Sequence, residues 1–191
     1  DDQVGADTKF QDVFKDYNVS EQVEILAYGT RRAYLEAEKT IKEKAEDMLK
    51  HYVQHVFPNG YKAQVVAVST EAAHRYRMAF ELALQSLIAE LKVENKYNTD
   101  IEALEKLQVA VVMSDVDHNE KPHLKQYADS KLRKSATTGF KLKFGKTEKI
   151  NESNDQIANG NIGILIVVDM LLTGFDAPIE QVMYLDKVIV N

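Results

Sequence analysis

The succession of apolar and polar positions along the chain predicts buried strands separated by amphipathic helices. Four mainly apolar runs bounded by polar or turn residues lie at 63–68, 107–113, 162–168 and 181–185. Such runs are typical of strands buried on both faces of a sheet. Between the first two, apolar residues recur at spacings of three and four behind a capping Ser69 or Thr70, which predicts a helix. Strands alternating with helices predict an α/β fold, in which helices cover both faces of a parallel sheet and the crossovers are right-handed.

The segments outside this repeat give weaker patterns. Residues 31–56 repeat apolar positions at three and four and are followed by Pro58-Asn59-Gly60, which predicts one amphipathic helix. That helix could present a coiled-coil partner face, but a helix laid across the domain is the favoured interpretation. Residues 1–30 predict a linker with one or two short helices, so we expect the domain itself at 31–191. Further short helices are predicted at 122–131 and 151–159, the second ended by Gly160.

Charge is unevenly distributed along the chain. The net charge is −6, which argues against a general nucleic-acid-binding protein, because phosphate binding needs clustered cations. Residues 121–149, however, hold nine Lys or Arg against only Asp129 and Glu148. This stretch could face a polyanion, but a solvated surface insertion is the favoured interpretation. Phe140 and Phe144 lie between its lysines, where they could stack on bases or, more commonly, fix the segment to the core.

Composition removes several classes of site. There is no Cys, which excludes disulfides, thiol nucleophiles and cysteine-bound zinc. The five histidines show no ligand triad at a recognised spacing, so no metal site is predicted. The start of the chain has neither a basic nor an apolar leader, and no apolar run is long enough for a membrane span, so we expect a cytoplasmic protein without a membrane partner.

The segment after the third strand is the strongest candidate for chemistry. It reads Asp-x-x-x-Thr-Gly-x-Asp-x-Pro from Asp169 to Pro178, and polar residues just beyond a parallel strand lie where α/β proteins place their sites. Gly174 permits close backbone approach, Thr173 offers groups suited to a phosphate oxygen, and Asp176 is an acceptor. The simpler alternative is a well-formed connection in which Asp176 accepts backbone amides and Phe175 fills the core.

Leu171 to Pro178, with the strand that ends Tyr184 to Lys187, closely resembles motif V in the R subunit of type I restriction enzymes. The resemblance implies a second RecA-like domain of the P-loop NTPase superfamily, here without its own phosphate loop. It implies that Asp169, Gly174 and Asp176 lie at a nucleotide cleft and that Thr173 lies near DNA. Ser69, Thr70 and Arg75 resemble motif IV in position and are expected to contact DNA, although capping alone explains the hydroxyls.

The resemblance also implies what the parent protein does. It would be an ATP-dependent translocase and endonuclease that uses ATP and magnesium. It would act on double-stranded DNA together with the first RecA-like domain of the same chain and with methylation and specificity subunits. The sequence has no Gly-x-x-x-x-Gly-Lys-Ser/Thr loop and no acidic motif II, so the chain alone is expected to hold no cofactor, hydrolyse no ATP and cut no DNA.

Other interpretations remain open at the level of sequence. The chain has no initiator Met and stops after a strand, so we expect a piece of a larger protein, truncated at its C-terminus. It could instead be the second domain of another superfamily 2 helicase, acting on RNA or in repair. It could also be a noncatalytic α/β domain that binds nucleic acid or protein.

Overall fold

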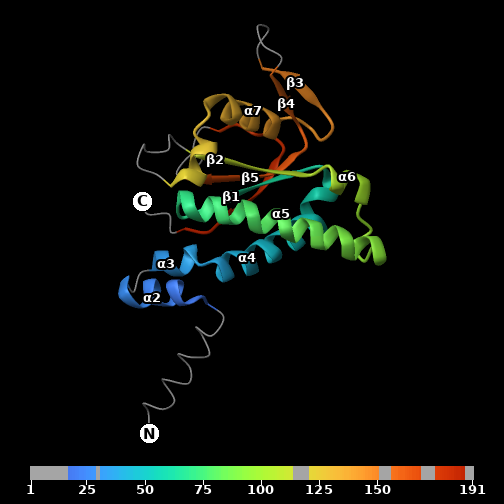
Figure 1. The fold of residues 1–191 in the computed structure, drawn as a ribbon. Coiled ribbons are helices and arrows are strands. Elements are labelled where there is room, and N and C mark those ends of the chain that lie inside the picture. Colours follow the sequence, from blue (N-terminus) through green and yellow to red (C-terminus); the bar gives the residue numbers. More distant parts are fainter. Residues whose placement is uncertain (1–16, 29–30, 114–120, 151–155, 169–174, 188–191) are drawn as a thin grey trace.

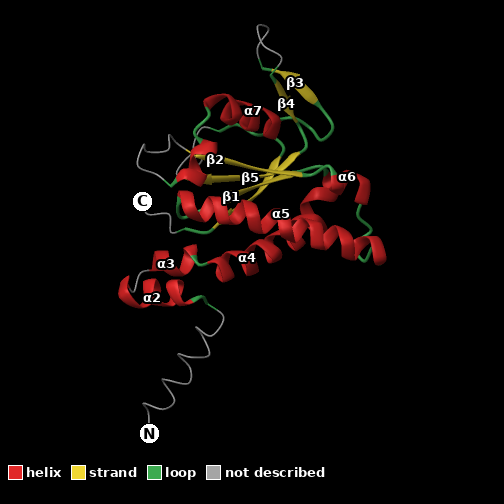
Figure 2. Cartoon of the chain, in the orientation of Figure 1, coloured by secondary structure: helices red, strands yellow, loops and turns green. Residues whose placement is uncertain are grey.

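The computed structural model describes residues 17–28, 31–113, 121–150, 156–168 and 175–187. Its centre is a four-stranded, fully parallel sheet in the order β2-β5-β1-β6, covered by helices on both faces (Figures 1 and 2). The strands are β1 (Lys62–Val66), β2 (Gln108–Met113), β5 (Ile162–Val168) and β6 (Glu180–Leu185). The predicted α/β class is confirmed, and the arrangement is consistent with a RecA-like domain. All seven residues of β5 are buried because this strand has a neighbour on each side and helices above and below.

One face of the sheet is covered by α5 (Thr70–Val93), with α4 (Glu38–His51) packed against it and the short α6 (Ile101–Glu105) near its end (Figure 1). The core on this side contains large, fully buried side chains, among them Ile41 and Leu49 of α4 and Tyr76 and Phe80 of α5. Residues 31–56 were expected to form a helix laid across the domain, and α4 packs in this way.

The single helix predicted at 31–56 is wrong, because the structure divides it. Helix α3 (Arg31–Glu36) ends before Ala37, whose backbone is extended, and α4 begins at Glu38. The helix continues past His51 as a π-helical turn at Tyr52–Val56 and a 3-10 turn at Phe57–Asn59. Gly60 ends it with φ of +76°, a conformation that explains the Pro-Asn-Gly signal. Helix α3 lies beside α2 (Val19–Tyr28), the helix before it in the chain.

The other face of the sheet is covered by α7 (Ser130–Lys141), a helix most of which was not predicted. The helix expected at 122–131 is instead a 3-10 helix at Pro122–Tyr127, followed by α7. The helix expected at 151–159 is wrong for its last residues: β4 (Ile157–Asn159) pairs antiparallel with β3 (Thr147–Lys149), and 151–155 lie outside the described residues. Phe140 is fully buried, so it fixes α7 to the core as the simpler interpretation predicted.

A buried lysine joins β1, α7 and the end of the β3–β4 hairpin. The Lys62 side chain is fully buried, and its Nζ donates to the carbonyl oxygens of Gly139 (3.0 Å) and Gly160 (2.8 Å). The Nζ also lies over the Phe140 and Phe144 rings, 5.6 and 5.1 Å from their centroids. A Cβ on Gly160 would press against the backbone oxygens of Lys143 and Lys146, so only glycine allows this close approach. Burial lowers the pKa of Lys62 to about 7.

This shift predicts how stability changes with pH. Below pH 7 both the folded and the unfolded chain keep the Lys62 proton; above it the folded chain loses the proton while the unfolded chain keeps it up to about pH 10.5. Stability should therefore rise between pH 7 and 9.5, with a contribution from Lys62 of up to about 1.4 kcal/mol per pH unit. We expect Lys62→Met to remove this rise in urea unfolding measured across that range.

The unfolding measurements stop at pH 9.5 because buried tyrosines also change the stability at higher pH. Burial raises the pKa of Tyr52, Tyr76 and Tyr184, and ionisation of these tyrosines in the unfolded chain lowers stability above about pH 10. Parallel pH profiles for the wild type and Lys62→Met would contradict the predicted role of Lys62.

None of the described helices has the length and apolar character needed to cross a membrane.

Candidate functional site

The carboxyl ends of three neighbouring strands lie at one edge of the sheet. β1 pairs with β5 on one side and β6 on the other, with Val66 opposite both Val167 and Leu185. The last residues of these three strands therefore lie side by side at the carboxyl edge of the sheet, where α/β proteins place their sites. Asp169, Thr173 and Gly174 lie outside the described residues, so their predicted roles stay predictions.

Ser69 forms the link between β1 and α5. Its backbone is extended, and its Oγ accepts the amide hydrogen of Ala72 at 3.1 Å, so Ser69 is the N-cap of α5. Its side chain is buried, and Thr70 begins the helix. The expected strand end and helix start are confirmed here. The hydroxyl of Ser69 serves the helix itself, as the capping interpretation proposed.

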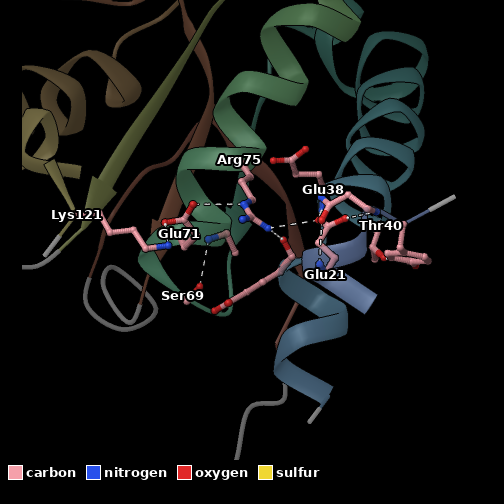
Figure 3. Close-up of polar contacts among 11 residues, drawn as sticks. Glu21, Glu38, Thr40, Ser69, Glu71, Arg75 and Lys121 are labelled. Atoms are coloured by element: carbon pink, nitrogen blue, oxygen red, sulfur yellow. Dashed lines mark hydrogen bonds and ion pairs between the residues drawn. The ribbon is translucent and has the colours of Figure 1, made fainter. Parts of the chain in front are cut away.

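Arg75 lies one turn into α5 and contacts acidic and carbonyl groups (Figure 3). Its Nη1 donates to the Glu36 carbonyl oxygen at 2.5 Å and lies 3.8 Å from a Glu21 carboxylate oxygen; its Nε lies 3.4 Å from Glu71. Glu21 also accepts the backbone amide of Glu38 at 2.7 Å, at the start of α4. Arg75 thus ties α2, α3 and α4 to α5, and a DNA phosphate would have to compete with two carboxylates for it.

Glu71 is the acidic centre of this cluster. Lys121 Nζ lies 3.2 Å from its Oε2, and His123 Nε2 lies 3.1 Å from the same atom. Burial opposes ionisation of Glu71, but hydrogen bonds from Lys121 and His123 and the nearby positive charges outweigh it, and the pKa of Glu71 is below its usual value. The carboxylate therefore stays charged and joins α5 to the start of the 3-10 helix after β2.

His74 extends the cluster along α5. Its ring centroid lies 4.8 Å from that of His123, and its Nδ1 lies 2.9 Å from the Tyr127 hydroxyl. Burial lowers the pKa of His74, and the positive charge at His123 adds to the effect. His74 and His123 line, with Glu71 and Arg75, an open hollow of about 440 Å³ whose wall includes the exposed apolar side chains of Met78 and Leu82. The sequence analysis did not predict this hollow, because its residues come from segments far apart in the chain.

The described part of the motif V segment runs back over the face that carries α7. Phe175 and Ala177 pack against the cluster around Phe140, and the Phe175 and Phe140 rings are stacked with centroids 6.1 Å apart. Phe175 therefore contributes to the core, as the simpler interpretation of this segment proposed. Asp176 is exposed, so its carboxylate is accessible for a ligand. The segment then reaches Glu180, opposite the first residue of β1.

Asp186 is a buried polar residue at this edge that the sequence analysis did not single out. It directly follows β6, and only 6% of its surface is exposed. Its carboxylate pairs with Lys44 of α4 and accepts a hydrogen bond of 2.7 Å from the Tyr76 hydroxyl of α5. Its amide donates to the Val66 carbonyl at 3.0 Å. The signal was available, because Asp186 ends an apolar strand just as Asp169 does.

Comparison with known proteins assigns the chain to a family. Residues 59–191 match the family described as type I restriction enzyme subunit R domain 3. The chain belongs to this family. It is also similar to the "Putative type I restriction enzyme MjaVIIP endonuclease subunit" of Methanocaldococcus jannaschii, with 33% identity over 127 residues that cover 66% of this chain. The chain spans 10% of that relative's length.

The family match spans the whole sheet and both candidate segments, from the turn before β1 to the end of the chain. The resemblance to type I restriction R subunits expected from Leu171 to Pro178 is therefore confirmed. Residues 1–58 lie outside the matched range, yet Ile41 and Leu49 of α4 belong to the same buried core as the sheet.

Proposed function

We propose that this chain is the second RecA-like domain of the ATP-dependent DNA translocase motor in a type I restriction endonuclease R subunit. The observation that supports it best is the parallel pairing of β1 with β5, combined with the family match. At the carboxyl edge of the sheet, the pairing places the end of β1, which precedes the motif IV-like residues, beside the end of β5, which precedes the motif V-like residues. A cleft between two RecA-like domains requires nucleotide and DNA groups together at such an edge.

The residues divide by chemistry. Asp176, with Gly174 and Asp169, would face the nucleotide, since an exposed carboxylate can bind ribose hydroxyls or the water around a triphosphate. Ser69 and Thr70 would lie near the DNA backbone, where the backbone amides at the start of α5 suit phosphate oxygens while the Ser69 hydroxyl caps the helix. Thr173 would lie near the same phosphates, as its hydroxyl and amide suit a phosphate oxygen. Magnesium would be held mainly by the first RecA-like domain, because the phosphate loop and acidic motif that bind it are absent from this sequence.

In the complete subunit, the two RecA-like domains would close on ATP and reopen after hydrolysis, moving duplex DNA toward the nuclease domain. Methylation and specificity subunits would complete the assembly and select the DNA site. One observation favours a noncatalytic interaction domain instead: Arg75, expected at the DNA, is held by Glu71 and Glu21.

The two functions are separated by a translocation assay on the complete subunit assembled with its partner subunits. A motor should displace a third DNA strand bound downstream of the recognition site, with ATP and magnesium but not with a nonhydrolysable ATP analogue. DNA-stimulated ATP hydrolysis measured in parallel should show the same requirement. An assembled complex that binds DNA but neither hydrolyses ATP nor displaces the third strand would support the interaction domain and contradict the motor.

A further inference from the structure

Three lysines form a stripe on the outward face of α7. Lys131, Lys134 and Lys141 are all exposed, and their spacings of three and seven place them on one side of the helix together with Thr138. The opposite side carries Phe140, which is fully buried against the sheet. We call Lys131, Lys134 and Lys141 the lysine stripe. It extends about 15 Å along the helix axis, the length of about four base pairs of duplex DNA.

Among the described residues, no acidic side chain pairs with the lysine stripe. Within the part of the chain that the structure describes, no carboxylate lies within ion-pair distance of the three Nζ atoms. Of the residues that the structure describes, the acids next to α7 are Asp129, which caps α7 through the Lys131 amide, and Glu148 on β3. Three more exposed lysines follow on the turn and β3: Lys143, Lys146 and Lys149. A local basic surface therefore exists on a chain with a net charge of −6.

The lysine stripe leads to the motif V segment. At its C-terminal end, an open hollow of about 370 Å³ is lined by Thr137, Thr138, Lys141, Leu142, Glu148 and Phe175. Lys141 Nζ lies 4.7 Å from the centroid of the Phe175 ring. Phe175 directly precedes Asp176 in the chain. The hollow thus combines hydroxyls, a cation and a half-buried aromatic ring, which are groups that bind nucleic-acid backbones and bases.

We infer that the lysine stripe binds the phosphate backbone of duplex DNA and directs it along α7 toward the motif V segment. This inference rests on the proposed function, since it supplies a second DNA contact for the same motor, on the α7 face of the sheet. The lysines of 121–149 are exposed, as expected of a solvated surface segment, and α7 packs on the sheet. The contact is electrostatic and independent of base sequence, because lysines on a helix surface reach phosphates rather than base edges.

The test is a binding measurement on the 191-residue chain with a fluorescent duplex, by anisotropy over a range of salt concentrations. The stripe variant is Lys134→Gln with Lys141→Gln, and the matched control is Lys42→Gln with Lys50→Gln, two exposed lysines of α4 on the other side of the sheet. We expect the stripe variant to bind on the order of tenfold more weakly at low salt, with the slope of log affinity against log salt reduced by about two. The control should bind like the wild type.

Equal losses in the stripe and control variants would overturn the inference, because they would reflect net charge alone. Failure of the wild-type chain to bind the duplex at low salt would also overturn it. Thermal unfolding of each variant checks that all four substitutions, being on exposed side chains, leave the fold intact. The assay needs no ATP, so its failure is distinguishable from failure of the motor, which is measured by third-strand displacement in the complete complex.

Discussion

Asp176→Ala in the complete R subunit is expected to lower DNA-stimulated ATP hydrolysis by about a hundredfold or more. Asp176 is exposed, and the segment that carries it is fixed by the stacking of Phe175 on Phe140. A carboxylate held in this way can bind the nucleotide or its water without reorganising, and alanine supplies no acceptor in its place. The measurement is the steady-state rate of ATP hydrolysis with saturating duplex DNA.

The control for this experiment is Asp47→Ala. Asp47 is an exposed carboxylate on α4, on the opposite side of the sheet from Phe175, and its loss changes the net charge equally. Asp47→Ala should hydrolyse ATP at the wild-type rate, and both variants should unfold at the wild-type temperature, since neither side chain is buried. Unaltered turnover in Asp176→Ala would remove the proposed nucleotide role of this residue.

Asp186→Ala is expected to destabilise the isolated chain by about 3 kcal/mol. The Asp186 carboxylate is buried and joins Lys44 of α4 to Tyr76 of α5, so alanine leaves the fully buried Tyr76 hydroxyl without its acceptor. The expected loss lies at the lower end of the range for broken buried ion pairs, because the Lys44 side chain is 30% exposed and can be solvated. Urea unfolding followed by circular dichroism measures the change.

A double-mutant cycle with Tyr76→Phe separates the hydrogen bond from the rest of the effect. Tyr76→Phe alone removes the donor but keeps the ring in the core, and we expect a smaller loss of about 1.5 kcal/mol. The loss of unfolding free energy in the double variant should be smaller than the sum of the losses in the two single variants, because the hydrogen bond can be lost only once. Strict additivity would show that the contact between Tyr76 and Asp186 contributes nothing to stability.

The strands and the helix after β1 could be predicted because local sequence alone specifies them. Continuous apolar runs define β1, β2 and β5, and Ser69 followed by apolar residues at helical spacing defines the start of α5. Each signal depends on residues within a single element, so no partner has to be known. The resemblance around Leu171 to Pro178 was equally local, and it led to the family that the comparison confirms.

Helix α7 shows why other elements could not be predicted. Its sequence includes Ser135, Thr137, Thr138 and Gly139, which have low or neutral helix propensity. The helix is stabilised by contacts with distant segments: Phe140 is buried against the sheet, and Gly139 allows the backbone of Asn159 to come close. Tertiary packing therefore overrides local propensity here, and the same applies to the hairpin residues 157–159 that were expected to be helical.

The candidate site divides in the same way. The positions of Ser69 just after β1 and of Asp169 just after β5 along the chain follow from the order of apolar and polar residues. The ion pairs that hold Arg75 do not, because Glu21 comes from a helix far upstream and reaches Arg75 only after the chain breaks at Ala37.

By itself, the sequence determined the α/β class, the four strands of the main sheet and the family, since these depend on periodicity and on a contiguous motif. Only the tertiary structure decided the strand order, the buried roles of Lys62 and Asp186, and the lysine stripe beside Phe175. The physical reason is that burial, ion pairing and surface alignment depend on distances between segments remote in the chain, and hydrophobic patterning does not encode those distances.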